Sequence, residues 1–261
     1  DIYVTDMAPS DHIKSKVFMA SMDTKKFHSF VDHGMHYQYM LNTLQLNNGD
    51  NTFREIGQLA GIDKTEWTWA SLFLDIDFDG NKDLFITNGI KENTNDNDLN
   101  EKLKSRQKEL KKPTLSFEEF MEVVTKMITP NQVYKNNGDL TFEDKSQDWG
   151  LKIPSFSNGA VFSDLDLDGD LDYVINNIND KAFIFENKLM NAETPPNYIQ
   201  LELRGDNQNP NALGAKILMR YSNGDFQFQE QQISRGYMSS VDPVIYFGLG
   251  LKNEIGSIEV L

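Results

Sequence analysis

The feature that most constrains the fold is an acidic nine-residue pattern that occurs twice. Both copies read Asp-x-Asp-x-Asp-Gly-x-x-Asp, at residues 75–83 and 164–172. They lie 89 residues apart (164 − 75 = 89), and the same offset relates the segment NNGDNTF at 47–53 to NNGDLTF at 136–142. One ungapped offset over this length indicates an internal structural repeat.

Short strands are predicted around each acidic pattern. Residues 69–74 lead into the first pattern and residues 84–87 leave it, while 132–135 and 141–144 flank a hairpin turn at 136–139. This gives four short antiparallel strands per unit, which is the content of a propeller blade. We therefore predict an all-β fold with a partial β-propeller, with a sandwich of hairpins as the alternative.

Two segments interrupt this regular series of short strands. Residues 8–41 and 90–130 both fall between the second and third strands of a unit, so we expect both on the face opposite the acidic loops. In the second segment a helix is predicted from 99 to 112, where Pro113 ends it, and a capping box at 116–119 opens a helix to about 128.

The pattern of predicted secondary structure changes after Pro195 and Pro196. Residues 198–203, 215–221, 226–230 and 257–260 alternate as half-buried strands, and 222–225 is a hairpin turn. We predict two domains, with propeller blades at 1–192 and a small β-sandwich-like module at 193–261.

Each acidic loop supplies the oxygen ligands that calcium prefers. The predicted ligands are Asp75, Asp77, Asp79, the backbone carbonyl of Asn81 and Asp83, and then Asp164, Asp166, Asp168, the carbonyl of Asp170 and Asp172. An EF-hand would need an acidic residue at position twelve, which here is Ile86 or Ile175. The alternatives are magnesium, which prefers fewer carboxylates, and an acidic turn without metal. Asp1 precedes a similar strand, so we expect it to end a third loop of a longer protein.

Composition narrows the classes of partner. The net charge is −15, and without a basic stripe nucleic acid is not an expected partner. The chain has no cysteine, which excludes a disulfide scaffold and a thiolate metal site. No apolar run in the sequence reaches the length of a membrane span.

The motif FSDLDLDGDLDYV at 162–174 resembles the FG-GAP/VCBS repeat of integrin-α-like propellers. Residues 213–216, 235–243 and 245–250 resemble the ASPIC/UnbV domain. Together they are similar to the family of cartilage acidic protein and its bacterial surface relatives of the Bacteroidetes type. The resemblance implies a calcium-loaded propeller that is secreted or sits on the outer-membrane surface, with no established catalytic activity.

The expected function is a scaffold that binds a glycan or a protein at the cell surface. An outer-membrane complex is one assembly in which such a scaffold would take part. The alternative is a polysaccharide hydrolase or lyase with structural calcium, using a carboxylate pair that sequence cannot locate. Other candidates are weaker: a metal pair at His33 and His36, sugar stacking on Trp67 and Trp69, and a serine nucleophile near Arg235. The other histidines, His12 and His28, also lie in the first insertion.

Overall fold

The computed structural model describes residues 1–17, 24–37, 39–94, 96 and 98–261. Residues 18–23 and 38 of the first predicted insertion, and 95 and 97 of the second, lie outside the described residues. The chain packs as two compact units. Unit 1 comprises 1–68, 88–130 and 154–156, and unit 2 comprises 69–87, 131–153 and 157–261.

The described residues are mostly β-strand with few helices, as predicted. In unit 1 the main sheet has the order β1-β3-β4, and its antiparallel strands are β1 (Ile2–Val4), β3 (Thr43–Asn47) and β4 (Phe53–Glu55). A short helix, α3 (Gly57–Ala60), follows and ends at Gly61 in the left-handed region (φ 77°). β2 (Met7–Ala8) pairs with the first residues of β5.

The remaining helices of unit 1 belong to the two insertions: α1 (His12–Val17), α2 (Thr24–Asp32), α4 (Leu99–Leu110) and α5 (Phe117–Val123). Helix α4 lies within the predicted 99–112, and α5 begins with the predicted capping box, because the Ser116 side chain accepts from the Glu119 backbone. Within the described residues, none of the helices is long and apolar enough to cross a membrane.

The predicted end of the second helix near residue 128 is wrong. Helix α5 stops at Val123, and the chain continues as β8 (Thr125–Met127), which pairs with β7 (Ile90–Asn93). The β-branched run Val123-Val124-Thr125 favours an extended chain over a helix. Next come β9 (Thr129–Pro130) and its partner β12 (Pro154–Ser155).

The first acidic loop joins two strands of a five-stranded sheet of order β11-β10-β6-β5-β2. Besides β2, its strands are β5 (Glu66–Leu74), β6 (Asp83–Asn88), β10 (Gln132–Asn136) and β11 (Phe142–Asp144). All four predicted strands of this unit are present, and the hairpin between the last two begins at Asn136, paired with Phe142. β6 is buried along its whole length.

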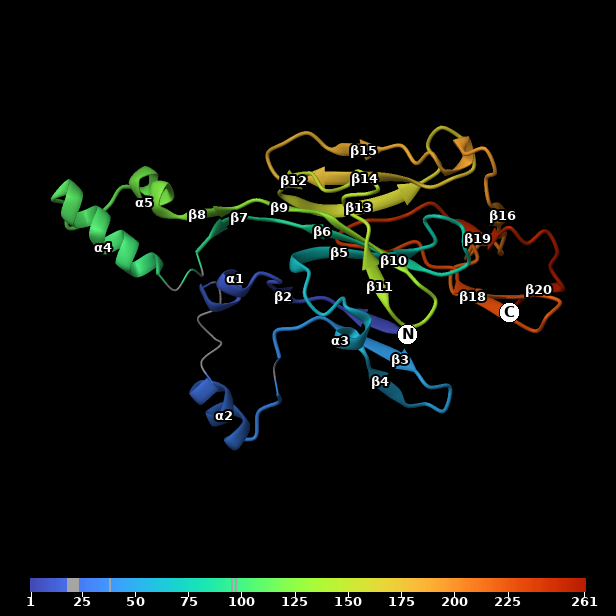
Figure 1. Cartoon of the computed structure of the whole chain (residues 1–261), viewed down its shortest axis with the longest axis horizontal. Helices are drawn as coiled ribbons and strands as arrows, with labels where there is room; N and C mark the ends of the chain where they lie inside the picture. Colours follow the sequence, from blue (N-terminus) through green and yellow to red (C-terminus); the bar gives the residue numbers. More distant parts are fainter. Residues whose placement is uncertain (18–23, 38, 95, 97) are drawn as a thin grey trace. The chain divides into compact units, whose positions relative to one another are not determined.

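The second acidic loop joins two strands of a three-stranded sheet, β13-β14-β15 (Figure 1). These strands are β13 (Ser157–Ser163), β14 (Asp172–Asn177) and β15 (Phe183–Phe185). The fourth predicted strand does not form in the described chain, which turns instead into a 3-10 helix at Leu189–Asn191.

The C-terminal segment forms two small sheets: β16 (Asn197–Glu202) with β19 (Val244–Gly250), and β17 (Lys216–Arg220) between β18 (Phe226–Glu230) and β20 (Ser257–Val260). It has a core of its own around Ile217, Met219 and Phe247. A second core of unit 2 runs from Leu72 and Phe85 of the sheets to Val241 and Tyr246 of the C-terminal segment. The predicted boundary at 192/193 therefore crosses a shared core.

Candidate metal centre

Loop 1, residues 75–83, connects β5 to β6 and is shaped by its own carboxylates. Asp75 Oδ2 accepts from the Gly80 backbone N–H at 3.0 Å, and Asp79 Oδ1 accepts from the Asn81 N–H at 2.8 Å. Gly80 has φ 98°, a conformation that glycine adopts without steric cost. These bonds hold the chain in a turn whose carboxylates face inward.

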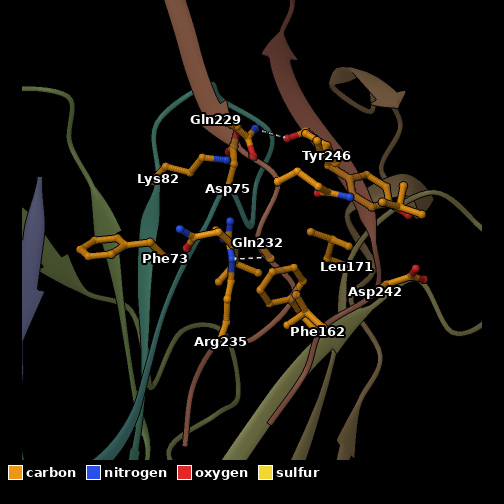
Figure 2. A pocket seen from close by; sticks show the side chains of 15 residues that line it. Phe73, Asp75, Lys82, Phe162, Leu171, Gln229, Gln232, Arg235, Asp242 and Tyr246 are labelled. Atoms are coloured by element: carbon orange, nitrogen blue, oxygen red, sulfur yellow. Dashed lines mark hydrogen bonds between the residues drawn. The ribbon is translucent and has the colours of Figure 1, made fainter. Parts of the chain in front are cut away.

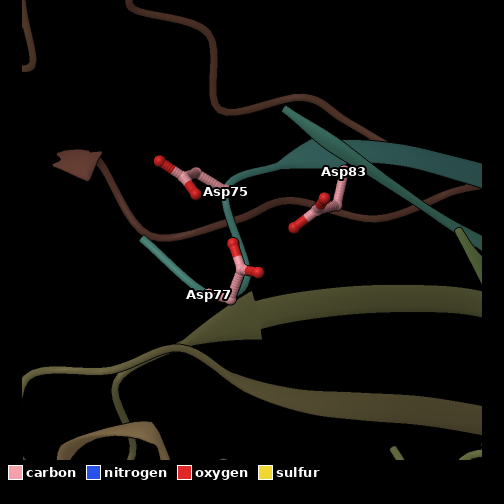
Figure 3. A group of neighbouring side chains, drawn as sticks. All are labelled: Asp75, Asp77 and Asp83. Carbon is pink, nitrogen blue, oxygen red and sulfur yellow. The ribbon is translucent and has the colours of Figure 1, made fainter. Parts of the chain in front are cut away.

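Three carboxylates of loop 1 converge (Figure 3). Asp75, Asp77 and Asp83 each offer an oxygen within 4.8 Å of the others. Asp83 is fully buried, and its Oδ1 and Oδ2 accept from the backbone N–H groups of Asn136 (2.8 Å) and Ile76 (3.0 Å). Asp75 Oδ1 and Asp77 Oδ1 are buried and accept no hydrogen bond. Buried carboxylate oxygens without donors fit a bound cation.

Loop 2, residues 164–172, repeats the backbone turn between β13 and β14, but its converging carboxylates are those of positions one, three and five, not one, three and nine. Asp164 Oδ2 accepts from the Gly169 N–H at 3.1 Å, and Asp172 Oδ2 accepts from the Leu165 N–H at 2.9 Å. Asp164, Asp166 and Asp168 place oxygens within 4.8 Å of one another. Asp164 Oδ1 is left without a hydrogen bond, so the first aspartate of both loops presents the same unpartnered atom.

Position seven differs between the loops. In loop 2 the side chain of Asp170 is fully buried, its Oδ2 accepts from the Met190 N–H at 3.0 Å, and its Oδ1 accepts no hydrogen bond. In loop 1 the corresponding Asn81 side chain donates to Asp79 at 3.0 Å. The sequence prediction used only the backbone carbonyl at this position, so it missed the buried carboxylate of Asp170.

Asp1 makes the contact that marks the last aspartate of both loops. Its Oδ1 accepts from the Asn47 N–H at 2.8 Å, as Asp83 accepts from Asn136 and Asp172 accepts from Asn187, each at 2.8 Å. In each case the donor ends or follows the strand next to the one that begins at the aspartate or, for Asp1, directly after it. Asp1 therefore makes the same backbone contact as Asp83 and Asp172, the last aspartates of the two loops.

Burial shapes the charge of loop 1. Desolvation raises the pKa of Asp75 to about 7, although Lys82 opposes this rise, and desolvation raises the pKa of Asp83 to about 8. The pKa of Lys82 falls to about 8, chiefly because it is desolvated. In loop 2 burial raises the pKa of Asp170 to about 6. Metal-free loops of this kind hold protons that a divalent cation would displace.

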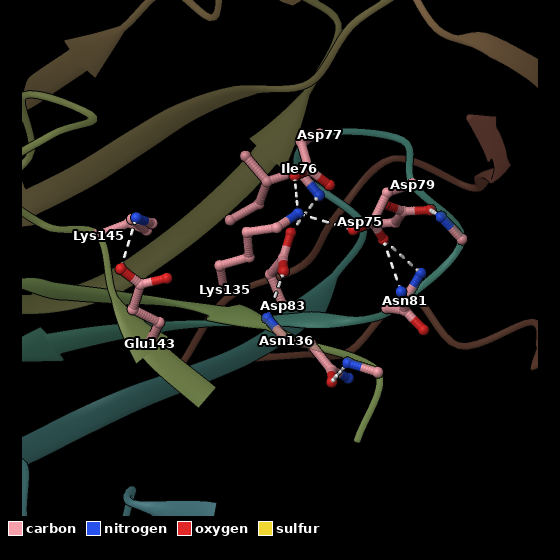
Figure 4. Close-up of polar contacts among 12 residues, drawn as sticks. Asp75, Ile76, Asp77, Asp79, Asn81, Asp83, Lys135, Asn136, Glu143 and Lys145 are labelled. Atoms are coloured by element: carbon pink, nitrogen blue, oxygen red, sulfur yellow. Dashed lines mark hydrogen bonds and ion pairs between the residues drawn. The ribbon is translucent and has the colours of Figure 1, made fainter. Parts of the chain in front are cut away.

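Two lysines lie beside the carboxylates of loop 1, one within the loop and one on a neighbouring strand. Lys82 extends toward Asp75 at the edge of a small cavity of about 30 Å³ that Arg235 and Gln232 also line (Figure 2). Lys135, on β10, makes ion pairs with Asp77 and with Asp79, the latter at 2.6 Å (Figure 4). Sequence reasoning missed Lys135 because it lies 58 residues from Asp77, and it missed Lys82 because the calcium pattern assigns no ligand to position eight of the loop.

The C-terminal segment covers loop 1. Phe78, fully buried at φ 53°, stacks on Tyr198 and Tyr246 with ring centroids 5.0 and 6.2 Å away. Its carbonyl accepts from the Gly250 N–H at 2.7 Å. A side chain at Gly248 would collide with the Asp75 carboxylate and the Phe78 backbone. Loop 1 is thus shaped as much by β19 as by its own sequence.

The weaker candidates are not brought together as sites. His33 Nδ1 lies 2.6 Å from the Ser29 carbonyl, and in the described part of the chain only the two acidic loops gather three metal-binding side chains. Trp69 packs against Tyr237 at 4.7 Å, as a partly buried ring. The Ser239 hydroxyl donates to the Tyr237 carbonyl at 2.7 Å.

The all-oxygen ligand sets of both loops fit calcium or another hard cation. A search of curated proteins found none that matches this chain. Residues 205–261 match the family described as ASPIC and UnbV. The C-terminal part of the chain is therefore similar to ASPIC and UnbV domains, as its motifs predicted.

Proposed function

We propose that this chain is part of a calcium-binding β-propeller of the FG-GAP/VCBS type, which carries an ASPIC/UnbV module and acts as a scaffold outside the cell or on the outer-membrane surface. The observation that carries the metal assignment is the repeated unpartnered oxygen, Asp75 Oδ1 in loop 1 and Asp164 Oδ1 in loop 2. Two loops of the same backbone geometry each aim a desolvated carboxylate oxygen inward without a donor.

The meander β5-β6-β10-β11, four consecutive neighbours in the five-stranded sheet, supports the propeller, because a meander of four antiparallel strands is the content of one blade. Calcium in such a loop links the strand that enters to the strand that leaves, and so stabilises the blade by mass action. The dissociation constants expected for extracellular calcium modules are about 10⁻⁴–10⁻³ M.

A calorimetric titration with calcium chloride tests the assignment. The wild-type chain should bind one ion in each complete loop, and Asp77→Ala or Asp166→Ala should each remove one ion while leaving the other. Asp148→Ala is the matched control, since this exposed aspartate lies in unit 2 outside both loops. Unchanged stoichiometry in both loop variants would refute the metal assignment.

The partner-binding role is supported by aromatic side chains of the first insertion. Helix α2 has no buried residue, and Tyr37 and Tyr39, which are 63% and 64% exposed, stack at 6.3 Å beside Phe27. Exposed aromatic faces of this kind suit sugar rings or a protein partner. Binding of the Tyr37→Ser/Tyr39→Ser variant to a panel of purified glycans, compared with Phe117→Ser on α5, tests the glycan form of the proposal. Equal binding by both variants would argue against it.

A further inference from the structure

One position beside the metal loops carries a different charge in each copy of the repeat. Asn136 and Asn187 donate their backbone N–H to the ninth aspartates of loops 1 and 2, and Asn47 makes the same hydrogen bond to Asp1. The residues directly before these asparagines are Leu46, Lys135 and Glu186. Structurally equivalent positions are thus apolar beside Asp1, cationic beside loop 1 and anionic beside loop 2.

The cation beside loop 1 reaches the predicted ligands. Lys135 Nζ pairs with Asp77 and with Asp79 Oδ2, and the side chains of all three are at most about one-third exposed, at 26%, 25% and 32%. These ion pairs place the ammonium group next to two of the carboxylates that a calcium ion would use.

We propose that Lys135 is an internal counter-cation that sets the calcium affinity of loop 1 below that of loop 2, so that the two loops fill at different calcium concentrations. The inference rests on the proposed calcium binding. A calcium ion that enters loop 1 has to displace the ammonium from Asp77 and Asp79 or bind beside it. In loop 2 the equivalent position holds an exposed glutamate, Glu186, in place of a lysine.

The magnitude follows from Coulomb's law. A unit charge in contact with the ligands of a divalent ion, partly screened by water, should change the dissociation constant by at least about tenfold.

The test measures loop 1 alone, in a background where Asp166→Ala has inactivated loop 2. Calorimetry with calcium chloride compares this background with the same chain carrying Lys135→Met, which keeps the length of the side chain and removes its charge. The matched control is Lys145→Met, because Lys145 pairs with Glu143 and Asp148, away from the loop (Figure 4). Lys135→Met should tighten binding at least tenfold, and Lys145→Met should leave it within about twofold.

The outcomes separate this inference from the proposed function. If loop 1 binds calcium equally well with and without Lys135, the inference is wrong and the metal assignment stands. If calcium binds only after Lys135→Met, the lysine excludes the ion at the concentrations tested, which supports the inference. If neither chain binds calcium, the metal assignment of loop 1 fails and the inference fails with it.

A reciprocal substitution does not depend on the folding of the Lys135 variant. In an Asp77→Ala background, where only loop 2 binds, Glu186→Lys should weaken calcium binding at least tenfold, and Glu186→Gln should have a smaller effect of the same sign. Calcium affinity that is the same for glutamate, glutamine and lysine at this position would overturn the proposal that it tunes the loops.

Discussion

Loops 1 and 2 share a pattern and a backbone but lie in different surroundings. The fourth residue of each loop has a positive φ, 53° at Phe78 and 63° at Leu167, and the glycine two residues later has φ 98° or 105°. Yet Phe78 is fully buried under the C-terminal segment, whereas Leu167 is 86% exposed. The motif dictates the conformation of the loop, and the neighbours of each copy decide its burial and charge.

The difference in burial should have its largest effect on stability at Phe78 and Leu167, the fourth residues of the two loops. Phe78→Ala removes a ring that stacks on Tyr198 and Tyr246, so we expect a loss of about 3–5 kcal/mol in the free energy of unfolding. Leu167→Ala changes an exposed side chain and should cost less than about 0.5 kcal/mol. Urea denaturation in saturating calcium measures both. Similar losses for the two variants would mean that loop 1 is not anchored by its ring.

A smaller effect is expected where β19 passes loop 1. Gly248→Ala forces a methyl group against the Asp75 carboxylate and the Phe78 backbone, which should cost about 1–3 kcal/mol of stability. Because Asp75 is a predicted ligand, the same change should weaken calcium binding at loop 1. Loop 2 is the internal control in a two-site titration. If calcium binding weakens at both sites, or at neither, then β19 has no specific effect on the metal site of loop 1.

The sequence predicted the local parts of this site well. Asp and Gly at fixed spacing specify turns that carboxylate-to-backbone bonds close, and both loops have these bonds. The capping box of α5 was likewise local, because Ser116 and Glu119 are three residues apart. Such features depend on neighbours along the chain, so spacing alone reveals them.

Features that depend on distant segments were missed. Lys135 reaches loop 1 across paired strands, and Phe78 is buried by residues more than a hundred positions later. Inside the second insertion, strands β7 and β8 pair with each other, although α4 and α5 lie between them in the sequence. The sequence periodicity of the insertion therefore revealed its helices but not this strand pair. Tertiary contacts of this kind override the local pattern.

The pH dependence of the metal-free protein should reflect loop 1. Asp75 and Asp83 have pKa values raised to about 7 and about 8, so from about pH 4 to pH 8 the folded chain binds more protons than the unfolded chain. Stability in chelator should therefore fall as pH rises through this window, and calcium should reverse the trend because it binds the charged carboxylates.

Thermal unfolding in chelator and in millimolar calcium, at about pH 5.5 and about pH 8.5, measures this effect. We expect the melting temperature in chelator to be lower at the higher pH by at least about 2–4 °C, the shift that about 1 kcal/mol produces in a chain of this size, because linkage from both raised pKa values exceeds that amount. Asp83→Asn removes one of the two titrating groups and should flatten the dependence. A melting temperature in chelator that rises with pH would contradict the account.

The most direct test of the central claim is anomalous diffraction from crystals of the chain grown with calcium, collected at a long wavelength where calcium scatters anomalously. The account predicts one anomalous peak in each loop, with Asp75, Asp77 and Asp83 around the first ion and Asp164, Asp166 and Asp168 around the second. In loop 1 the Lys135 ammonium should be displaced from Asp77. Loops that hold no anomalous peak at saturating calcium, with Lys135 still paired to Asp77, would contradict it.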